Sequence, residues 1–236
     1  MLLEQAIFTS ARTKRHQGYQ LVARSASLAD GLADFLAKWG PTHGSLLSNN
    51  VRSESINFTS IDRDWVALSR TLYGGPEYSA RGALQVVTRF LVARRSQLIG
   101  YDSNPIALVR TAKLLGQLWL NPSLKSPTLP AVDLPECVPQ HLLAASGKVP
   151  SEKLVNRSLE AVRGERLAVV GAEDPVTTMD YIIRRTPRDE RLEISFTTGL
   201  VPSQHRQFRI HMLQELDAAM HDRLSHQGIR FLAASV

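Results

Sequence analysis

The chain has 236 residues, of which 43% are hydrophobic and 21% are charged, and its formal net charge is +6. This composition excludes a disordered chain and supplies enough apolar residues for one large or two small domains. A single cysteine, Cys137, excludes an internal disulfide framework, and no apolar run reaches the roughly 18 residues of a membrane span. We therefore expect a cytoplasmic protein that does not enter a membrane.

The positive charge is concentrated in the first half of the chain. Residues 1–120 carry 14 Lys and Arg against 8 Asp and Glu, whereas residues 121–236 carry 14 of each kind. A basic half is typical of a protein that binds nucleic acid or an acidic partner. However, the arginines are scattered singly, without a block of five or six like charges. Binding of nucleic acid or a nucleotide by the basic half is therefore the alternative hypothesis for function.

Residues 1–120 are predicted to consist mainly of strands. Apolar runs bounded by turn residues indicate strands over residues 4–12, 18–27, 55–62, 65–75 and 82–94. Two helices are expected among them. One follows Ser27 as its capping residue, and the other starts at Ser103 or Asn104 and runs to about Trp119.

A proline-rich stretch separates the two halves. Residues 121–139 hold five of the twelve prolines, which indicates an extended connector. We expect a basic, strand-rich lobe over residues 1–120, a connector over 121–150 and a second lobe over 151–236.

The second half combines helices with strands. Helices are expected after the capping residues Ser151 and Asp174 and again over residues 214–224, and a buried strand is expected at 166–172. Residues 193–200 and 206–213 are predicted to form a hairpin of two strands. The predicted fold class is α+β, with mixed, largely antiparallel sheets and interspersed helices.

No motif in the sequence fixes a reaction. There is no G-x-x-x-x-G-K-[ST], no G-x-S-x-G and no H-E-x-x-H, and the seven histidines and one cysteine lack zinc-ligand spacing. We therefore expect no cofactor and no metal, and we assign no catalytic residue. An enzyme with a dispersed site is a third hypothesis, which predicts a deep pocket with convergent titratable groups.

Two loops carry candidate binding residues. The first contains Gly74-Gly75-Pro76, which is typical of a turn in a longer hairpin loop. Arginine and tyrosine are common anchors at protein interfaces, and the N–H groups of a Gly-Gly turn can hold an anion. The side chains expected to project from one end of the sheet are Arg70, Glu77, Tyr78 and Arg81.

The second loop repeats this chemistry with hydroxyl groups and arginines. Its candidate binding residues are Thr197, Thr198, Ser203, Arg206 and Arg209. The two loops form one binding edge if they lie on the same side of the protein. The sequence leaves two alternatives open: the loops lie on opposite sides, or both are ordinary turns.

Several stretches resemble a known bacterial family. "QAIFTSAR", "GYQLVARS", "SRTLYGGPEYSARG" and "QVVTRFLV" are similar to the N-terminal domain (type 2) of bacterial GTPase-associated proteins. "ISFTTGLVPSQHRQFRIHML" resembles the stretch that follows in the same proteins. Proteins of this family tend to be longer than this chain, which is then expected to be a stand-alone version or a fragment.

The resemblance implies a role in binding. Proteins of the family are associated with NTP-dependent conflict, or immunity, systems and act as adaptors beside a GTPase and an effector. It therefore implies a non-enzymatic adaptor whose partner is a GTPase or effector protein of the same system. The binding residues that it implies are Arg70, Tyr73, Gly74, Gly75, Glu77 and Tyr78, followed by Thr197, Thr198, Gly199 and Arg206.

Overall fold

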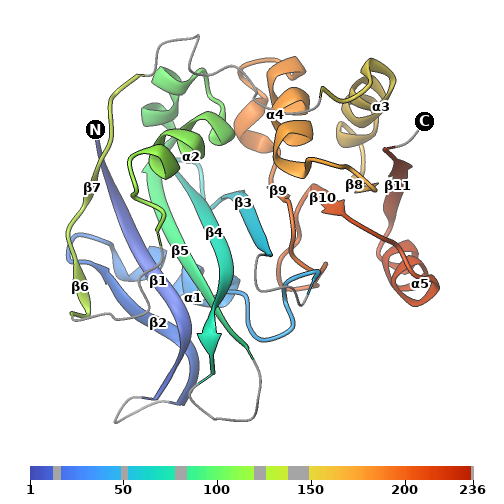
Figure 1. Cartoon of the computed structure of the whole chain (residues 1–236). Coiled ribbons are helices and arrows are strands. Elements are labelled where there is room, and N and C mark those ends of the chain that lie inside the picture. Colours follow the sequence, from blue (N-terminus) through green and yellow to red (C-terminus); the bar gives the residue numbers. More distant parts are fainter. Residues whose placement is uncertain (13–16, 49–52, 78–83, 120–125, 138–148, 235–236) are drawn as a thin grey trace.

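A computed structural model describes residues 1–12, 17–48, 53–77, 84–119, 126–137 and 149–234 (Figure 1). Within these residues the strands are β1 (Leu2–Arg12), β2 (Gln17–Ser25), β3 (Glu54–Ser60), β4 (Trp65–Pro76), β5 (Leu84–Arg94), β6 (Thr128–Leu129), β7 (Val132–Asp133), β8 (Arg166–Val170), β9 (Phe196–Thr197), β10 (Ile210–Leu213) and β11 (Ile229–Ala233). The helices are α1 (Asp30–Trp39), α2 (Pro105–Leu114), α3 (Glu152–Val162), α4 (Pro175–Arg185) and α5 (Ala218–His226), with 3-10 helices η1 (Arg95–Tyr101) and η3 (Arg191–Glu193).

The described strands form one mixed sheet. Its order is β11-β8-β10-β9-β3-β4-β5-β1-β2-β6, and β7 pairs with β1. The strands from β3 to β2 in this order are antiparallel, whereas β11, β8, β10 and β9 are parallel to one another. The predicted α+β class is confirmed.

The predicted hairpin in the second half is wrong. Strands β9 and β10 are parallel, with Phe196 opposite Ile210, and β9 pairs antiparallel with β3 on its other edge. The alternation of Phe208, Ile210 and Met212 indicates a strand but does not define its direction. All four residues of β10 are buried, which is typical of a parallel strand that lies between two others.

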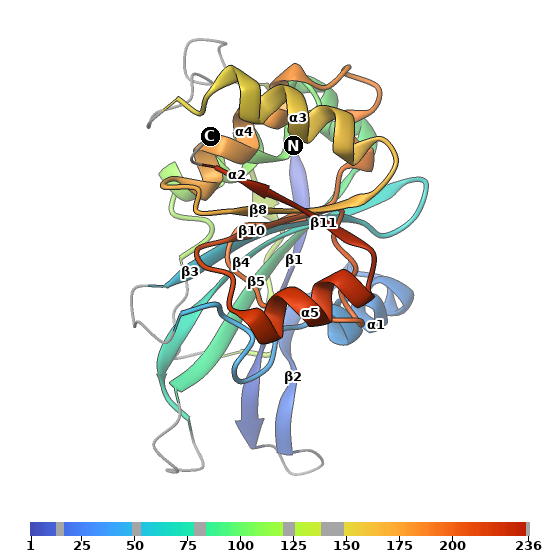
Figure 2. The same ribbon diagram turned by 90° about the vertical axis from the view of Figure 1, so that its right-hand side faces the viewer.

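Helices cover both faces of the sheet. Helices α2, α3 and α4 lie on one face, and α1 and α5 lie on the other (Figure 2). Because successive side chains of a strand point to opposite faces, Val66 and Leu68 of β4 pack in the core with α2, whereas Ala67 packs with α1. None of the described helices has the length and apolar character that a membrane span requires.

The sheet passes through both predicted lobes. Strand β9 of the second half lies beside β3 of the first, and one hydrophobic cluster contains side chains from Leu3 to Leu232. Strands β6 and β7, which belong to the predicted connector, pair with β2 and β1. The division into two lobes at residues 121–150 stays a prediction.

Three of the predicted helix starts are confirmed. The side chains of Asn104, Ser151 and Asp174 each accept hydrogen bonds from backbone N–H groups in the first turn. Ser27 does not cap α1, because its hydroxyl donates to Glu4 at 2.8 Å and the helix follows Ala29. The last helix begins after Asp217, later than predicted, and this aspartate caps it.

A buried carboxylate joins the two halves of the chain. Asp180 of α4 is fully buried and accepts hydrogen bonds from Asn104 at 2.7 Å and from Arg110 of α2 at 2.5 Å. Arg184, one turn further along α4, donates at 3.0 Å. These bonds fix α2, which carries part of the candidate site, against the second half of the chain.

Candidate functional site

Arg70 lies inside the fold, under the end of α2. Its Nε and Nη2 donate to the carboxylate of Glu54 at 2.8 and 2.6 Å, and its Nη1 donates to the carbonyl of Leu118 at 3.2 Å. Lys113 donates to the other oxygen of Glu54 at 2.7 Å. Burial alone would raise the pKa of Glu54, but the bonds from Lys113 and Arg70 outweigh burial and lower it. The expectation that Arg70 projects from the end of the sheet is therefore wrong.

Tyr73 and Glu77 of the first loop contact other parts of the fold. Tyr73 is buried in a cluster that contains Leu200 and Phe208 from the second candidate stretch. Glu77 accepts a hydrogen bond from the Ser10 hydroxyl at 2.9 Å. The structure thus brings the two predicted stretches together through buried apolar side chains. Whether they form a binding edge stays a prediction.

Steric constraints favour glycine at two positions of the first loop. Gly75 has a φ of +111°, which a residue with a side chain rarely adopts. A Cβ on Gly74 would lie 2.3 Å from the side chain of Val87. Tyr78 and Arg81, the remaining candidates of this loop, lie outside the described residues.

The threonines of the second loop join β9 to β3. The hydroxyl of Thr197 donates to the Oδ1 of Asn57 at 2.6 Å, and the hydroxyl of Thr198 accepts from the N–H of Ile56 at 2.8 Å. Both threonines are buried, so their hydroxyl groups hold the two parts of the sheet together. A role of these residues in binding a partner stays a prediction.

We expect Gly199→Ala to lower the free energy of unfolding by roughly 1–3 kcal/mol. A Cβ at this position would lie 2.7 Å from the carbonyl oxygen of Glu54, which is backbone and cannot turn away as a side chain would. Denaturant unfolding checks the value. Gly31→Ala is the control, because a Cβ there meets nothing within 4 Å, and alanine within a helix is expected to be neutral or stabilising. Equal stability of both variants would contradict this interpretation of Gly199.

The other residues of the second loop lie at different depths. Ser203 is half-buried, and its hydroxyl accepts from the N–H of His205 at 3.3 Å. Arg206 is buried, whereas Arg209 is half-buried and its N–H donates to the Ser195 hydroxyl at 3.0 Å. Arg206 is therefore not an exposed anchor.

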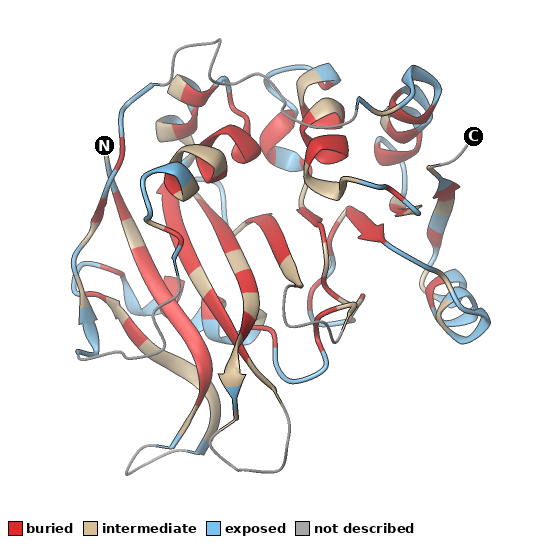
Figure 3. Ribbon diagram, in the orientation of Figure 1, coloured by how far each residue is buried: buried red, intermediate tan, exposed pale blue. Residues whose placement is uncertain are grey.

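The exposed apolar side chains at the end of α2 form a surface that was not predicted from the sequence. Leu114, Leu115 and Trp119 are 81%, 51% and 69% exposed. The ribbon is coloured as exposed where α2 ends (Figure 3). We call these three residues the α2-end surface. Leu118, which lies between them in the sequence, is fully buried. Three large apolar side chains are therefore exposed within six residues, and the side chain of Leu118 among them is buried in the core.

The backbone under the α2-end surface is held by a helix-terminating turn. Gly116 has a φ of +71°, its N–H donates to the carbonyl of Lys113 at 3.0 Å, and the N–H of Gln117 donates to that of Ala112 at 2.8 Å. This is the Schellman arrangement, in which a left-handed residue ends the helix. The helix consequently ends at Leu114, before the predicted end at Trp119.

Two arginines of the sheet fix the residues that follow this turn. Arg70 donates to the carbonyl of Leu118, and Arg89 of β5 donates to that of Trp119 at 2.8 Å. Arg89 also donates through its Nε to Gln5 at 2.9 Å, and burial lowers the pKa of this guanidinium. Trp119 is thus exposed on a backbone that the underlying sheet holds in place.

The family model of GTPase-associated protein 1, N-terminal domain type 2, matches residues 2–135, which is more than half of the chain. The chain belongs to this family. Comparison with curated proteins and with solved structures gave no match. The predicted resemblance is confirmed for the matched residues, and the resemblance of residues 194–213 stays a prediction.

The matched residues contain the α2-end surface. The GTPase-associated domain extends from β1 to β7 and includes Arg70, Arg89 and the whole of α2. The sequence "LLGQLWL", residues 114–120, has five apolar residues around a glycine, more than a helix end needs for one buried face. This pattern was the signal that could have identified the surface.

A hollow of about 380 Å³ lies beside the GTPase-associated domain, at the ends of β9 and β10. Among its described lining residues only Glu54 is titratable, and this carboxylate is already paired with Arg70 and Lys113. In the described part of the chain, no group of three or more His, Cys, Asp or Glu comes together to hold a metal ion. The described geometry of this hollow assigns no reaction.

Proposed function

We propose that this protein is a non-enzymatic adaptor of a bacterial conflict system that binds a GTPase through the α2-end surface. Membership of a GTPase-associated family supports the class of partner. One observation carries the choice of surface: Trp119 is exposed while its backbone is fixed by Arg89, inside the matched residues.

The exposed side chains suit a protein partner. Tryptophan is among the residues that contribute most to binding energy at interfaces, and Leu114 and Leu115 enlarge the apolar area around it. A surface that is already ordered loses less conformational entropy when it binds. Clustered exposed apolar side chains are also typical of interaction sites, whereas single ones are common on any protein.

The residues beneath the surface have a positioning role in this proposal. Arg70 and Arg89 hold the carbonyls of Leu118 and Trp119, so the two arginines support the interface without contacting the partner. Arg70, which the resemblance implied as a binding residue, has in this proposal the role of a half-buried support. Contacts from the exposed parts of the two loops remain a further prediction.

Capture of partners from native host cells tests the proposal. We expect the tagged chain to retain a protein with GTP-hydrolysing activity after nuclease treatment and at high salt, because apolar contacts depend little on salt. Trp119→Ala is expected to lose this protein. Val149→Ala is the control, since Val149 is an equally exposed apolar residue outside the matched region.

The same experiment tests the alternative hypothesis. A protein that binds nucleic acid through its basic half loses affinity steeply as the salt concentration rises. Capture of nucleic acid that is released at high salt, without a retained GTPase, would contradict the adaptor proposal. Equal capture of a GTPase by wild type and Trp119→Ala would contradict the choice of surface.

A further inference from the structure

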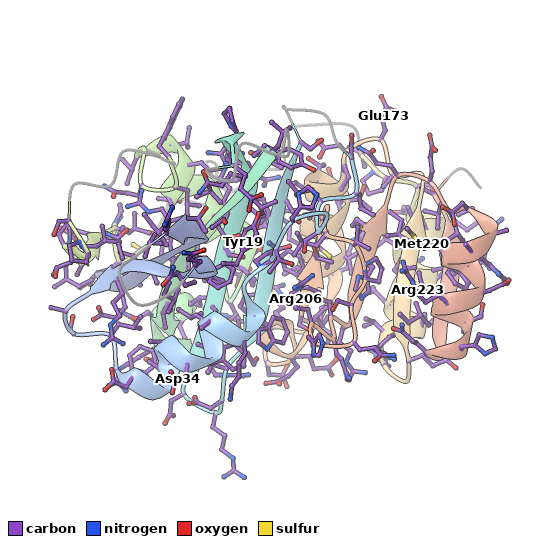
Figure 4. All side chains as sticks on the ribbon, turned by 90° about the horizontal axis from the view of Figure 1, so that it is seen from below. Tyr19, Asp34, Glu173, Arg206, Met220 and Arg223 are labelled. Carbon is purple, nitrogen blue, oxygen red and sulfur yellow. The ribbon has the colours of Figure 1, made fainter. Side chains whose placement is uncertain are left out.

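A small cavity lies on the face of the sheet that α1 covers. Arg206 enters it from the connection between β9 and β10, and Trp39 and Phe208 form an aromatic wall, with their ring centroids 5.1 Å apart. Seen from below, Arg206 lies between α1 and the C-terminal strands (Figure 4). The cavity has room for roughly one water-sized group.

Arg206 is a buried cation that lacks a carboxylate partner among the described residues. It is 9% exposed, its Nη2 donates to the Ser45 hydroxyl at 3.3 Å, and its Nε has no hydrogen-bond partner in the part of the chain that the structure describes. Burial lowers the pKa of this guanidinium, but an arginine in a protein stays charged. A buried charge with an unmet donor destabilises the fold, so a compensating anion would stabilise it.

Arg166 adds to the positive potential near Arg206, as His211 indicates. His211 of β10 is buried, its Nδ1 lacks a hydrogen-bond partner among the described residues, and its ring packs against that of Phe208. Burial lowers its pKa to about 4, with further contributions from the charges of Arg166 and Arg206. Both guanidinium groups are therefore close enough to disfavour another positive charge at this place and to favour a negative one.

The polar groups that line the cavity favour a ligand that only accepts hydrogen bonds. The Ser69 hydroxyl accepts from Asn57 at 3.1 Å, which leaves its own proton for an acceptor. The Oδ1 of Asn57 already accepts from Ser55 and Thr197. A water molecule would bring two protons into a space bounded largely by aromatic and aliphatic side chains, whereas an anion brings acceptors alone.

We propose that Arg206 binds one small, singly charged anion in this cavity. Its Nε donates to the anion, the Ser69 hydroxyl is the second donor, and Trp39 and Phe208 limit the size of the ligand. The anion is a chloride ion. Formate and sulfate, with three and five heavy atoms, are too large for a space of about one water-sized group. This site is separate from the α2-end surface and does not depend on the proposed adaptor role.

Denaturant unfolding of the whole chain in sodium chloride, sodium formate and sodium sulfate at equal ionic strength tests the proposal. We expect chloride to stabilise the protein with a saturable dependence on concentration, and formate and sulfate to lack this effect. Arg206→Met should raise the half-saturating concentration about ten- to hundredfold, because a hydrogen bond to a charged group is lost. Arg209→Met, three residues along the chain, should behave as the wild type.

The pattern among the anions identifies the ligand. Saturable stabilisation by chloride alone indicates the proposed halide site, and saturable stabilisation by formate as well would contradict the size limit of the cavity. Equal effects of all three salts, or unchanged saturation in Arg206→Met, would overturn the proposal. Absence of saturable stabilisation would also overturn it, because the cavity would then hold water.

A second measurement covers the case in which Arg206→Met does not fold. Ser69→Ala keeps the cation and removes one donor, and it is expected to weaken the anion effect by a smaller factor. The indole N–H resonance of Trp39 in the wild type should shift as chloride is added and should not shift with formate or sulfate. A Trp39 resonance that responds identically to all three salts would contradict binding in the cavity.

Discussion

Asp180→Ala is expected to lower the free energy of unfolding by about 3–5 kcal/mol. The carboxylate is fully buried and receives hydrogen bonds from Asn104, Arg110 and Arg184. Removing it leaves two guanidinium groups without their counter-charge and an amide without its acceptor. The same change separates α2 from α4, because Asn104 and Arg110 belong to the start and the middle of α2.

Urea unfolding followed by circular dichroism measures this effect. Asp34→Ala is the matched control, since Asp34 is an exposed aspartate within α1 and its loss is expected to change stability by less than about 0.5 kcal/mol. A loss of less than about 1 kcal/mol in Asp180→Ala would contradict the structural role of this network.

Acid is expected to destabilise the protein by about 3 kcal/mol through His211 alone. The pKa of His211 is lowered from 6.5 to about 4 by burial and then by Arg166 and Arg206. Below pH 6.5 the unfolded chain binds a proton at this histidine while the folded chain does not. Unfolding therefore becomes easier as the pH falls from 6.5, and this contribution stops growing below about pH 4.

The variant His211→Gln isolates this contribution from the acidic residues. As the pH falls from 7 to 4, the unfolding free energy of the wild type should fall by about 3 kcal/mol more than that of the variant. His226→Gln is the control, because this histidine at the end of α5 is exposed whereas His211 is buried. A difference for His211→Gln that is independent of pH would mean that His211 accepts a proton in the folded chain.

The sequence predicted local structure well where one local interaction decides it. Asn104, Ser151 and Asp174 start helices because each side chain bonds the first turn, and such bonds depend on neighbours in the chain. The direction of β10 could not be predicted, because it depends on pairing with β8 and β9, which are distant in sequence. Periodicity reports which face a residue occupies and not which strand it meets.

In the candidate site, too, contacts between residues distant in sequence could not be predicted. The sequence predicts that Arg70 projects from the sheet, but Arg70 is half-buried and bonds Glu54, which Lys113 also bonds, and the chain brings these residues together only by folding. The exposure of Trp119 depends on Gly116 and on the two arginines beneath it. The apolar run of residues 114–120 indicates a surplus of apolar residues, but only the structure shows which of them are exposed.

Titration of the purified chain with its captured GTPase tests the central claim most directly. Trp119→Ala should weaken the affinity roughly 30-fold or more, the loss expected at a central interface residue, while leaving the unfolding free energy nearly unchanged because the side chain is exposed. Val149→Ala should bind as the wild type does. Unchanged affinity of Trp119→Ala for the GTPase would contradict the proposal that the α2-end surface is the binding site.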